Sequence, residues 1–248
     1  SFKWRSLRMN HQIRYSLAGF CMGVAELIPG ISGATVAVIF KIYPNLMSIL
    51  SQLRLKNLSL DFSLIALTFQ FRVSLPLIFS MFVAIILCSN LISFLLSNHE
   101  QLFLHLLGWF MMFLSIYVAD FFRASFRRLN LLIFLFLGIL IGYILQELNI
   151  NSDEVTPLYL FISGLIAFSF FLIPGISGSA ILVVLGAYSP VIQAIANFNF
   201  FILFPFVLGC LISLLILPKI VVSLYTKYEQ SLMYIFSGLI FSSGYFLL

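Results

Sequence analysis

One seven-residue segment with a Pro-Gly pair at its centre occurs twice in this chain. Residues 27–33 read Leu-Ile-Pro-Gly-Ile-Ser-Gly, and residues 172–178 repeat them unchanged at an offset of 145 (172 minus 27). The same offset aligns three pairs outside the segment: Gly19 with Gly164, Val38 with Val183 and Tyr43 with Tyr188. Later the offset falls to 129, which aligns Pro76 with Pro205, as a shorter loop in the second copy would give. The chain is therefore an internal duplication, and its halves are expected to share one fold.

The composition predicts that this fold is built in a membrane. Hydrophobic residues make up 62% of the 248 residues, charged residues make up 8%, and the mean hydropathy is +1.14. A soluble domain carries about 25% charged residues, so this chain has too few to cover a globule in water. We expect an all-α polytopic membrane protein, because a helix satisfies its own backbone groups in lipid. Five apolar runs approach the ~20 residues that a spanning helix needs, namely 74–96, 102–122, 131–148, 201–222 and 232–248.

Two further apolar regions, 16–50 and 158–196, are too long for one helix, and each contains one copy of the Pro-Gly segment. Proline removes a backbone donor and disfavours helix in the residue before it, while glycine permits a turn. Each region is therefore predicted to be a broken helix, two half-helices joined at the break. A broken backbone is tolerated at membrane depth only where protein or a water-filled cavity satisfies it.

The basic residues predict how the chain crosses the membrane. Nearly all Lys and Arg lie in or beside gaps between apolar runs, so the net charge of +5 indicates a basic membrane face and not nucleic-acid binding. If each broken region is a re-entrant hairpin, the N-terminus and the loops 51–72, 123–130 and 223–230 share this face. The loops 97–101, 149–157 and 197–200, which hold no Lys or Arg, then lie on the other face. The N-terminus is expected to be cytoplasmic, in the cytoplasmic (inner) cell membrane.

This topology divides the chain into two inverted repeats within a single integral membrane domain, residues 1–248. Repeat one covers about 16–122, a linking helix about 131–148, and repeat two about 158–248. The linking helix adds an odd span, which inverts the second copy. Inverted repeats whose broken helices meet near the midplane are typical of secondary transporters.

The residues after each Pro-Gly pair begin a new half-helix, whose first N–H groups lack partners and lie at the positive end of the helix dipole. Glycines there let the backbone approach a ligand, and hydroxyl groups add donors. Two such ends that face one another predict a site for an anion, above all a phosphate. The alternative is that the serines cap their helices and the glycines serve packing. The candidate substrate-binding residues here are Gly30, Ser32, Gly33, Thr35, Gly175, Ser177, Gly178 and Ser179.

Two charged residues complete the candidate site. Glu26 is the only acidic residue in either hairpin, and its counterpart in the second copy is Phe171. A carboxylate within a bilayer is a functional candidate, and we hypothesise that Glu26 takes up a proton when a phosphate binds; the alternative is a structural, neutral Glu26. Lys41 is a candidate cation for the head group or a lysine that snorkels to the interface. His and Cys residues show no metal-binding spacing, so neither a metal nor another cofactor is expected.

The two segments resemble those of the polyprenyl-phosphate transporter family. The resemblance is carried by residues 22–35 with Ile42-Tyr43, and by residues 174–179 with 185–188, and it extends from about residue 16 to the C-terminus. It implies a multi-pass protein that returns undecaprenyl phosphate across the membrane for reuse in cell-envelope synthesis. This sequence departs from the usual pattern of the family at Glu26, Ala34 and Lys41, where Asp, Gly and Gly are commoner.

Three functions remain open from the sequence. The leading one is a lipid-phosphate translocase, a flippase and not an enzyme, which binds the head group between the two hairpin tips. Its partners would be the polyprenyl phosphate lipid and membrane lipids, and a homo-oligomer is left open. One alternative is a membrane polyprenyl-pyrophosphate phosphatase, but Gly33 and Gly178 stand where that class has Arg, and its paired carboxylates are absent. The other alternative is a small-anion transporter.

Overall fold

The structure is a computed structural model, and it describes residues 11–28, 30–53, 62–119, 129–148 and 156–248. Within these residues the chain is all-helical and contains no strand. The helices are α1 (His11–Glu26), α2 (Gly33–Ile39), α3 (Tyr43–Ser51), α4 (Phe62–Thr68), α5 (Phe71–Asn98), α6 (Glu100–Val118), α7 (Leu129–Glu147), α8 (Pro157–Phe171), α9 (Gly178–Val184), α10 (Tyr188–Ala196) and α11 (Phe200–Tyr245).

Four of the described helices are long and apolar enough to cross a membrane: α5, α6, α7 and α11. Three of them contain or closely match the predicted spans 74–96, 102–122 and 131–148. The fourth, α11, has 46 residues; this corresponds to about 69 Å of helix, twice the ~30 Å of a bilayer core. Together with the composition, these helices identify a multi-pass membrane protein.

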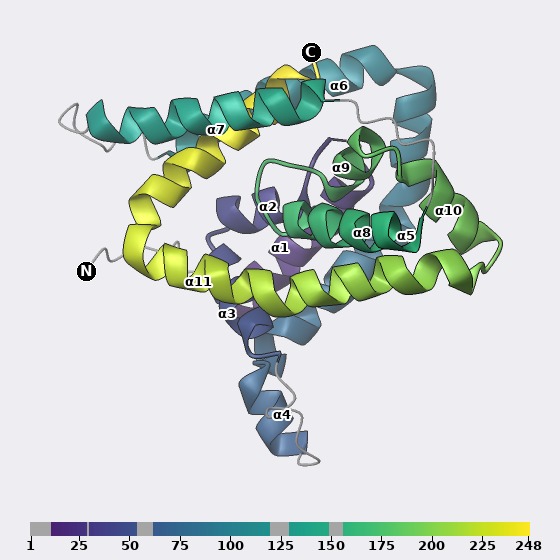
Figure 1. Cartoon of the computed structure of the whole chain (residues 1–248). Helices are drawn as coiled ribbons and strands as arrows, with labels where there is room; N and C mark the ends of the chain where they lie inside the picture. The colour runs from purple at the N-terminus through teal and green to yellow at the C-terminus, as the bar shows by residue number, and fades with distance from the viewer. Residues whose placement is uncertain (1–10, 29, 54–61, 120–128, 149–155) are drawn as a thin grey trace.

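The last two predicted spans, 201–222 and 232–248, lie on either side of a kink in α11. Tyr228 has φ −132° and ψ 39°, which is outside the helical region. In Figure 1 the helix runs from right to left above α3 and α4 and then turns back toward α6 and α7. The sequence predicts a loop at 223–230, whereas the structure makes the same reversal with a bent helix.

Each broken region consists of three helices, one more than the sequence predicts. Region one is α1, α2 and α3, and region two is α8, α9 and α10. The additional break follows the short helices α2 and α9, where Lys41 (φ 58°) and Gly186 (φ 73°) take the left-handed conformation. In both copies the same pair of hydrogen bonds closes the helix: Lys41 N to Val38 O and Ile42 N to Ala37 O, Gly186 N to Val183 O and Ala187 N to Leu182 O. These are Schellman C-caps.

Helix packing repeats between the copies as the sequence offsets predict. A Cβ atom at Gly19 of α1 would lie 2.2 Å from the carbonyl oxygen of Leu77 in α5, and one at Gly164 of α8 would lie 2.2 Å from that of Phe206 in α11. The residue pairs are related by the offsets of 145 and 129. Close backbone contact at small residues is typical of helices packed in membranes. The duplication is therefore present in the tertiary packing as well as in the sequence.

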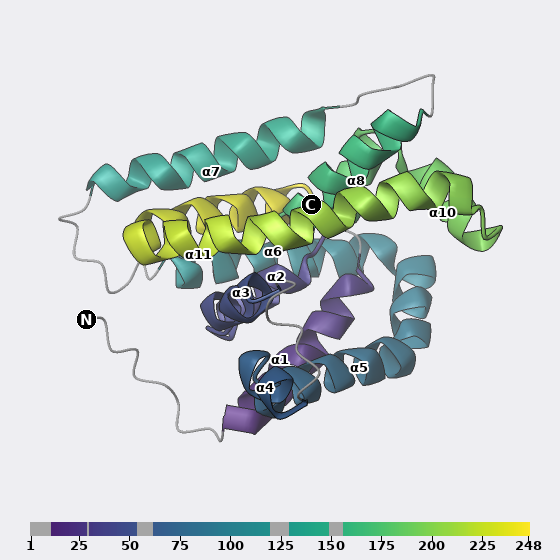
Figure 2. The ribbon, with the colours of Figure 1, turned by 60° about the horizontal axis from the view of Figure 1, so that its bottom comes forward.

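The two Pro-Gly segments lie in the interior of this arrangement. Figures 1 and 2 show α2 between α11 and α5, with α8 crossing α11 and α7 packed along the C-terminal part of α11. The segment side chains Ile28, Ile31, Leu172 and Ile176 are buried in one hydrophobic core with the C-terminal part of α11. The core thus holds both breaks in place.

Candidate functional site

We call residues 27–32 the first tip and residues 172–177 the second tip. Each tip turns at a glycine in the left-handed region, Gly30 with φ 83° and Gly175 with φ 89°. A Cβ atom at Gly175 would also come within 2.6 Å of Leu239 and Ile240 in α11, so only glycine fits there. The Gly30 carbonyl accepts a hydrogen bond from Ser243 Oγ at 2.7 Å.

The structure brings the second tip into direct contact with residues that follow the first. The buried Thr35 Oγ1 accepts a hydrogen bond from the Gly175 N–H at 2.8 Å. The buried Tyr43 hydroxyl donates to the Leu172 carbonyl at 3.0 Å. Two copies of the duplicated sequence therefore meet through two buried hydrogen bonds, which pin the second tip.

The N-terminus of α2, next to the first tip, is satisfied by the protein itself. Glu26 Oε1 accepts from the Gly33 N–H at 2.8 Å, and Ser32 Oγ accepts from the Ala34 N–H at 3.2 Å. The Thr35 N–H donates to the Ser32 carbonyl at 3.0 Å. The first three amides of α2 all have acceptors, and the first acceptor is a carboxylate, the side chain that the positive end of a helix dipole favours.

The N-terminus of α9, next to the second tip, lacks such acceptors. Ser177 is its N-cap but makes no side-chain capping bond; its Oγ lies 2.7 Å from Ser179 Oγ. Among the described residues, no acceptor is found for the N–H groups of Gly178, Ser179 and Ala180. The position that Glu26 has in the first copy is taken by Phe171, which cannot accept a hydrogen bond. Three amides thus remain available as donors at this end, together with one of the two hydroxyl hydrogens, because one serine hydroxyl donates to the other.

The glycines at the helix starts permit the protein's own atoms to approach. A Cβ atom at Gly33 would lie 2.6 Å from Glu26 Oε1, and one at Gly178 would lie 2.8 Å from Phe171 Cβ. The same position is filled by a carboxylate in one copy and by an aromatic side chain in the other. Ser177 is 8% exposed and Ser179 is exposed, whereas Ser32 is 2% and Thr35 0% exposed. The second copy therefore carries the accessible polar groups.

Lys41 lies outside this group of residues. It follows α2 at the end opposite to the first tip, and its Nζ lies 5.6 Å from the centroid of the Tyr117 ring, within the range of a cation–π contact. Its carbonyl accepts a hydrogen bond from Arg14 Nη2 at 2.7 Å. The structure thus brings Glu26, both tips and the starts of α2 and α9 together and places Lys41 at a distance along α2.

Three contacts of this region were not anticipated from the sequence: those of Tyr43, Ser243 and Arg14. The pairing of Tyr43 with Tyr188 by the repeat offset was a usable signal, but nothing in the sequence separates Ser243 from the other serines of its segment. In the part of the chain that the structure describes, no group of three or more His, Cys, Asp or Glu side chains could hold a metal ion.

A family model described as undecaprenyl phosphate translocase-like matches residues 22–247. A polyprenyl-phosphate transporter of Vibrio cholerae is 32% identical over 240 residues, which cover 93% of this chain and 75% of that protein. A polyprenyl-phosphate transporter of Staphylococcus aureus is 28% identical over 208 residues, 79% of this chain and 66% of that protein. No solved structure matches the chain.

Proposed function

Because this chain belongs to the undecaprenyl phosphate translocase-like family, we propose that it is a translocase that moves undecaprenyl phosphate across the cytoplasmic membrane. The name that both relatives carry, polyprenyl-phosphate transporter, supports this class of substrate. The phosphate binds between the two tips while the polyprenyl tail stays in lipid. The protein acts as a transporter, not as an enzyme, and uses no cofactor.

The observation that carries the proposal is the difference between the starts of α2 and α9. At α9 the amides of Gly178, Ser179 and Ala180 and the hydroxyl groups of Ser177 and Ser179 have no acceptor among the described residues other than each other. Amide and hydroxyl donors at the positive end of a helix suit a phosphate oxygen. The head group therefore binds on the second copy.

The first copy supports this site from the other side. Thr35 holds Gly175, and Glu26 with Ser32 holds the start of α2, so that the two tips stay in register. Gly30 and Gly33 allow the close packing that this requires. In this proposal Glu26 is the internal anion of the first copy, and the lipid phosphate is its counterpart on the second. Lys41, at the far end of α2, attracts the head group before it reaches the tips.

We also propose that the copies are inverted repeats with re-entrant hairpins. Each copy has the order long helix, short helix, short helix, followed by two spans; the first copy has the additional short helix α4 before its spans, and α7 adds an odd helix between the copies. The helices α9 and α10 are bent by 113° across their break, as in a re-entrant loop or a broken span. These repeats form one membrane domain, with repeat one at about 16–122, the link at 131–148 and repeat two at 158–248.

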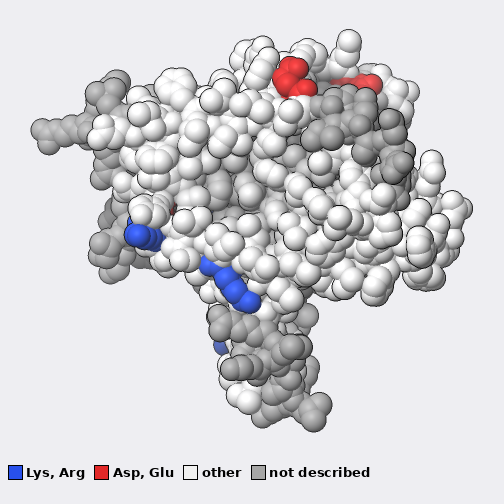
Figure 3. Space-filling view, viewed as in Figure 1, with Lys and Arg blue, Asp and Glu red and all other residues white. Residues whose placement is uncertain are grey.

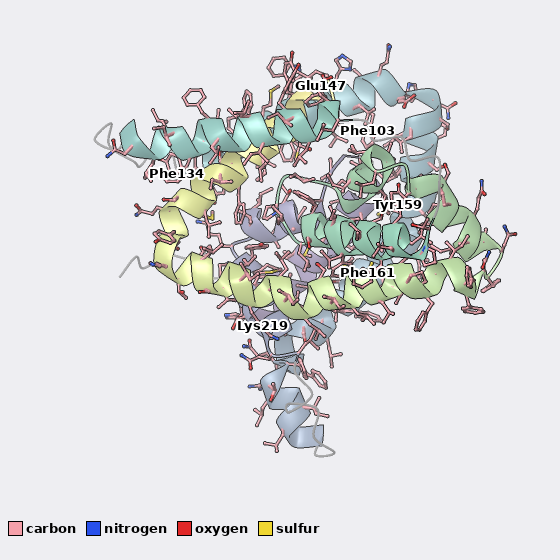
Figure 4. The ribbon with its side chains drawn as sticks, in the orientation of Figure 1. Phe103, Phe134, Glu147, Tyr159, Phe161 and Lys219 are labelled. Atoms are coloured by element: carbon pink, nitrogen blue, oxygen red, sulfur yellow. The ribbon has the colours of Figure 1, made fainter. Side chains whose placement is uncertain are left out.

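The charge distribution supports a cytoplasmic N-terminus. In Figure 3 the blue Lys and Arg side chains of the described residues lie at the lower left, and red acidic side chains lie at the upper edge. Figure 4 labels Lys219 on the lower side and Glu147 on the upper side. The spans α7 and α11 run from left to right in these views, so the two membrane faces lie at the left and right ends. The basic side chains lie in the left half, toward the kink of α11, and because basic residues are retained on the cytoplasmic side the left end is the cytoplasmic one.

The test is transport of a labelled polyprenyl monophosphate in liposomes that contain the purified protein, with release of inorganic phosphate measured in parallel. We expect lipid movement without phosphate release, and we expect the double variant Ser177→Ala/Ser179→Ala to be impaired. Phosphate release from a polyprenyl pyrophosphate would identify a phosphatase instead. Movement of free phosphate without lipid would identify a small-anion transporter.

A further inference from the structure

The C-terminal ends of α2 and α9, which lie away from the tips, are each hydrogen-bonded to a side chain near the start of the preceding helix. In the first copy Arg14 of α1 donates from Nε to the Phe40 carbonyl at 2.8 Å and from Nη2 to the Phe40 and Lys41 carbonyls. In the second copy the Tyr159 hydroxyl of α8 donates to the Leu185 carbonyl. Tyr159 lies near the start of α8, beside the chain that follows α9 (Figure 4).

These two ties are equivalent by the internal repeat. Arg14 and Tyr159 are 145 residues apart (159 minus 14), and so are Phe40 and Leu185 (185 minus 40), the C-cap residues of α2 and α9. The last carbonyls of a helix lack partners within the helix, so a donor side chain there fixes the helix end. Both copies therefore have a side-chain hydrogen bond to the C-terminal end of the short helix, but Arg14 makes it in the first copy and Tyr159 in the second.

The first tie is the stronger one. The guanidinium group of Arg14, which is permanently charged, donates three hydrogen bonds to backbone carbonyls. These carbonyls lie at the C-terminal end of α2, where the helix dipole favours a cation. Tyr159 makes one hydrogen bond with a neutral hydroxyl. Charge-assisted hydrogen bonds are roughly twice as strong as neutral ones. The end of α2 is therefore held more firmly than the end of α9.

The other attachments differ in the same direction. Five of the seven residues of α2 are buried, whereas Ser179 and Val183 of α9 are exposed. The start of α2 is capped by Glu26 and Ser32, and the start of α9 has no side-chain cap. The second tip, in contrast, is pinned by Thr35. Of the two short helices, α9 is thus fixed at its tip and held at its far end mainly by Tyr159.

We propose that Arg14 and Tyr159 are matched positioning residues for transport, and that the weaker Tyr159 tie lets α9 swing about the pinned second tip while α2 stays in place. The inference rests on the proposed function, because the swing changes the face toward which the head-group donors of α9 point. The first copy then stays fixed, and α9 is the part of the second copy that moves.

The first test is hydrogen exchange of backbone amides in the full chain in lipid nanodiscs without substrate. Amides in α9 exchange faster than those in α2 in the unaltered protein. Arg14→Gln speeds exchange in α2 about tenfold, as expected for the loss of charge-assisted hydrogen bonds, and leaves α9 unchanged; Arg14→Lys, which keeps a charged donor, restores part of the protection. Equal exchange in the two helices, or no effect of Arg14→Gln on α2, overturns the proposal.

The second test uses variants that strengthen or remove the hydrogen bond between Tyr159 and the Leu185 carbonyl. It measures their transport of polyprenyl monophosphate in liposomes. Tyr159→Arg slows exchange in α9 and lowers the maximal transport rate without changing the half-saturating lipid concentration. Tyr159→Phe, which deletes only a hydroxyl, speeds exchange in α9 with the same half-saturating concentration. A raised half-saturating concentration in either variant would place Tyr159 at the head group and overturn a positioning role. If the unaltered protein moves no lipid, the proposed function fails, while the exchange results still decide whether α9 is the looser helix.

Discussion

Thr35 and Gly175, 140 residues apart, are joined by a buried hydrogen bond in which the Thr35 Oγ1 accepts the Gly175 N–H at 2.8 Å. The bond is not repeated by the duplication, because the counterpart of Thr35 is Ala180, which has no hydroxyl group. The two copies are therefore joined by a one-sided contact, which pins the second tip and leaves the first without an equivalent bond.

Thr35→Val should weaken this junction, because it leaves the buried Gly175 N–H without an acceptor at a cost of about 1–3 kcal/mol. Thr35→Ser keeps the hydroxyl group and serves as the matched control. Thermal unfolding in detergent measures the effect, and the valine variant should unfold at a lower temperature than the serine variant. Equal unfolding temperatures would show that the bond contributes nothing.

Glu26→Gln should keep the fold, since a Gln side-chain oxygen also accepts from the Gly33 N–H, whereas Glu26→Ala should lose about 0.5–2 kcal/mol, as for other lost helix caps. If Glu26 takes up a proton when lipid phosphate binds, the Gln variant should bind the lipid but lose the dependence of net transport on a pH gradient. The measurement is uptake in liposomes with and without an imposed gradient. An unchanged dependence on the gradient would rule out this coupling.

The serines of the two copies should respond differently to removal of the hydroxyl. Ser177→Ala and Ser179→Ala should each raise the half-saturating lipid concentration, because a hydrogen bond to a charged partner contributes about 1.5–3 kcal/mol. Ser32→Ala removes a cap and should mainly lower stability, by about 1 kcal/mol. Transport kinetics and unfolding, measured on all three variants, separate the effects. A head-group site on the first tip would reverse the pattern.

Lys41 and Gly186 occupy equivalent positions of the two copies, and substitutions at both test whether the left-handed backbone there is strained. Lys41→Gly should raise stability by up to about 1 kcal/mol, because its left-handed φ of 58° suits glycine. Gly186→Ala should lower stability by a similar amount. Loss of the lysine charge should also slow transport at limiting lipid and low ionic strength, with no change at saturation. Unfolding temperatures that move in the same direction in both variants would contradict the strain argument.

Membrane orientation can be tested at two exposed residues in a variant that lacks Cys21, Cys88 and Cys210. Ser97→Cys lies in the last turn of α5 and should react with an impermeant thiol reagent added outside intact cells. Thr226→Cys, beside Lys227 near the α11 kink, should react only after the membrane is opened. Labelling of both residues from the same side would refute the proposed topology.

The long helices were predictable because their apolar runs are bounded by polar gaps, and predicted and observed bounds differ by four residues or fewer for α5, α6 and α7. The second break in each region was missed. Gly186 is a typical helix stop, but Lys41 at the same position of the first copy has no such preference. Its strained backbone is accompanied by tertiary contacts with Arg14 and Tyr117, which the sequence does not reveal.

The sequence predicted that the two Pro-Gly segments face one another, but it did not predict how their helix starts differ. The identical segments at 27–33 and 172–178 indicated two equivalent helix starts. The sequence shows that Phe171 stands where the first copy has Glu26. Only the structure shows that the Glu26 carboxylate accepts a hydrogen bond from the Gly33 N–H. That bond depends on the turn between Glu26 and Gly33, which side-chain identity alone does not define.

Gly175 packs so closely on Leu239 and Ile240 of α11 that no side chain fits between them. The same stretch of α11 is pressed against α7, where a Cβ atom at Gly138 would lie 2.3 Å from the Ile235 carbonyl and one at Gly238 would lie 2.2 Å from that of Leu135. Backbone contacts this close do not permit sliding. We therefore expect the second tip, the end of α11 and the linking helix to move as one rigid unit, although the linking helix separates the two copies in the sequence.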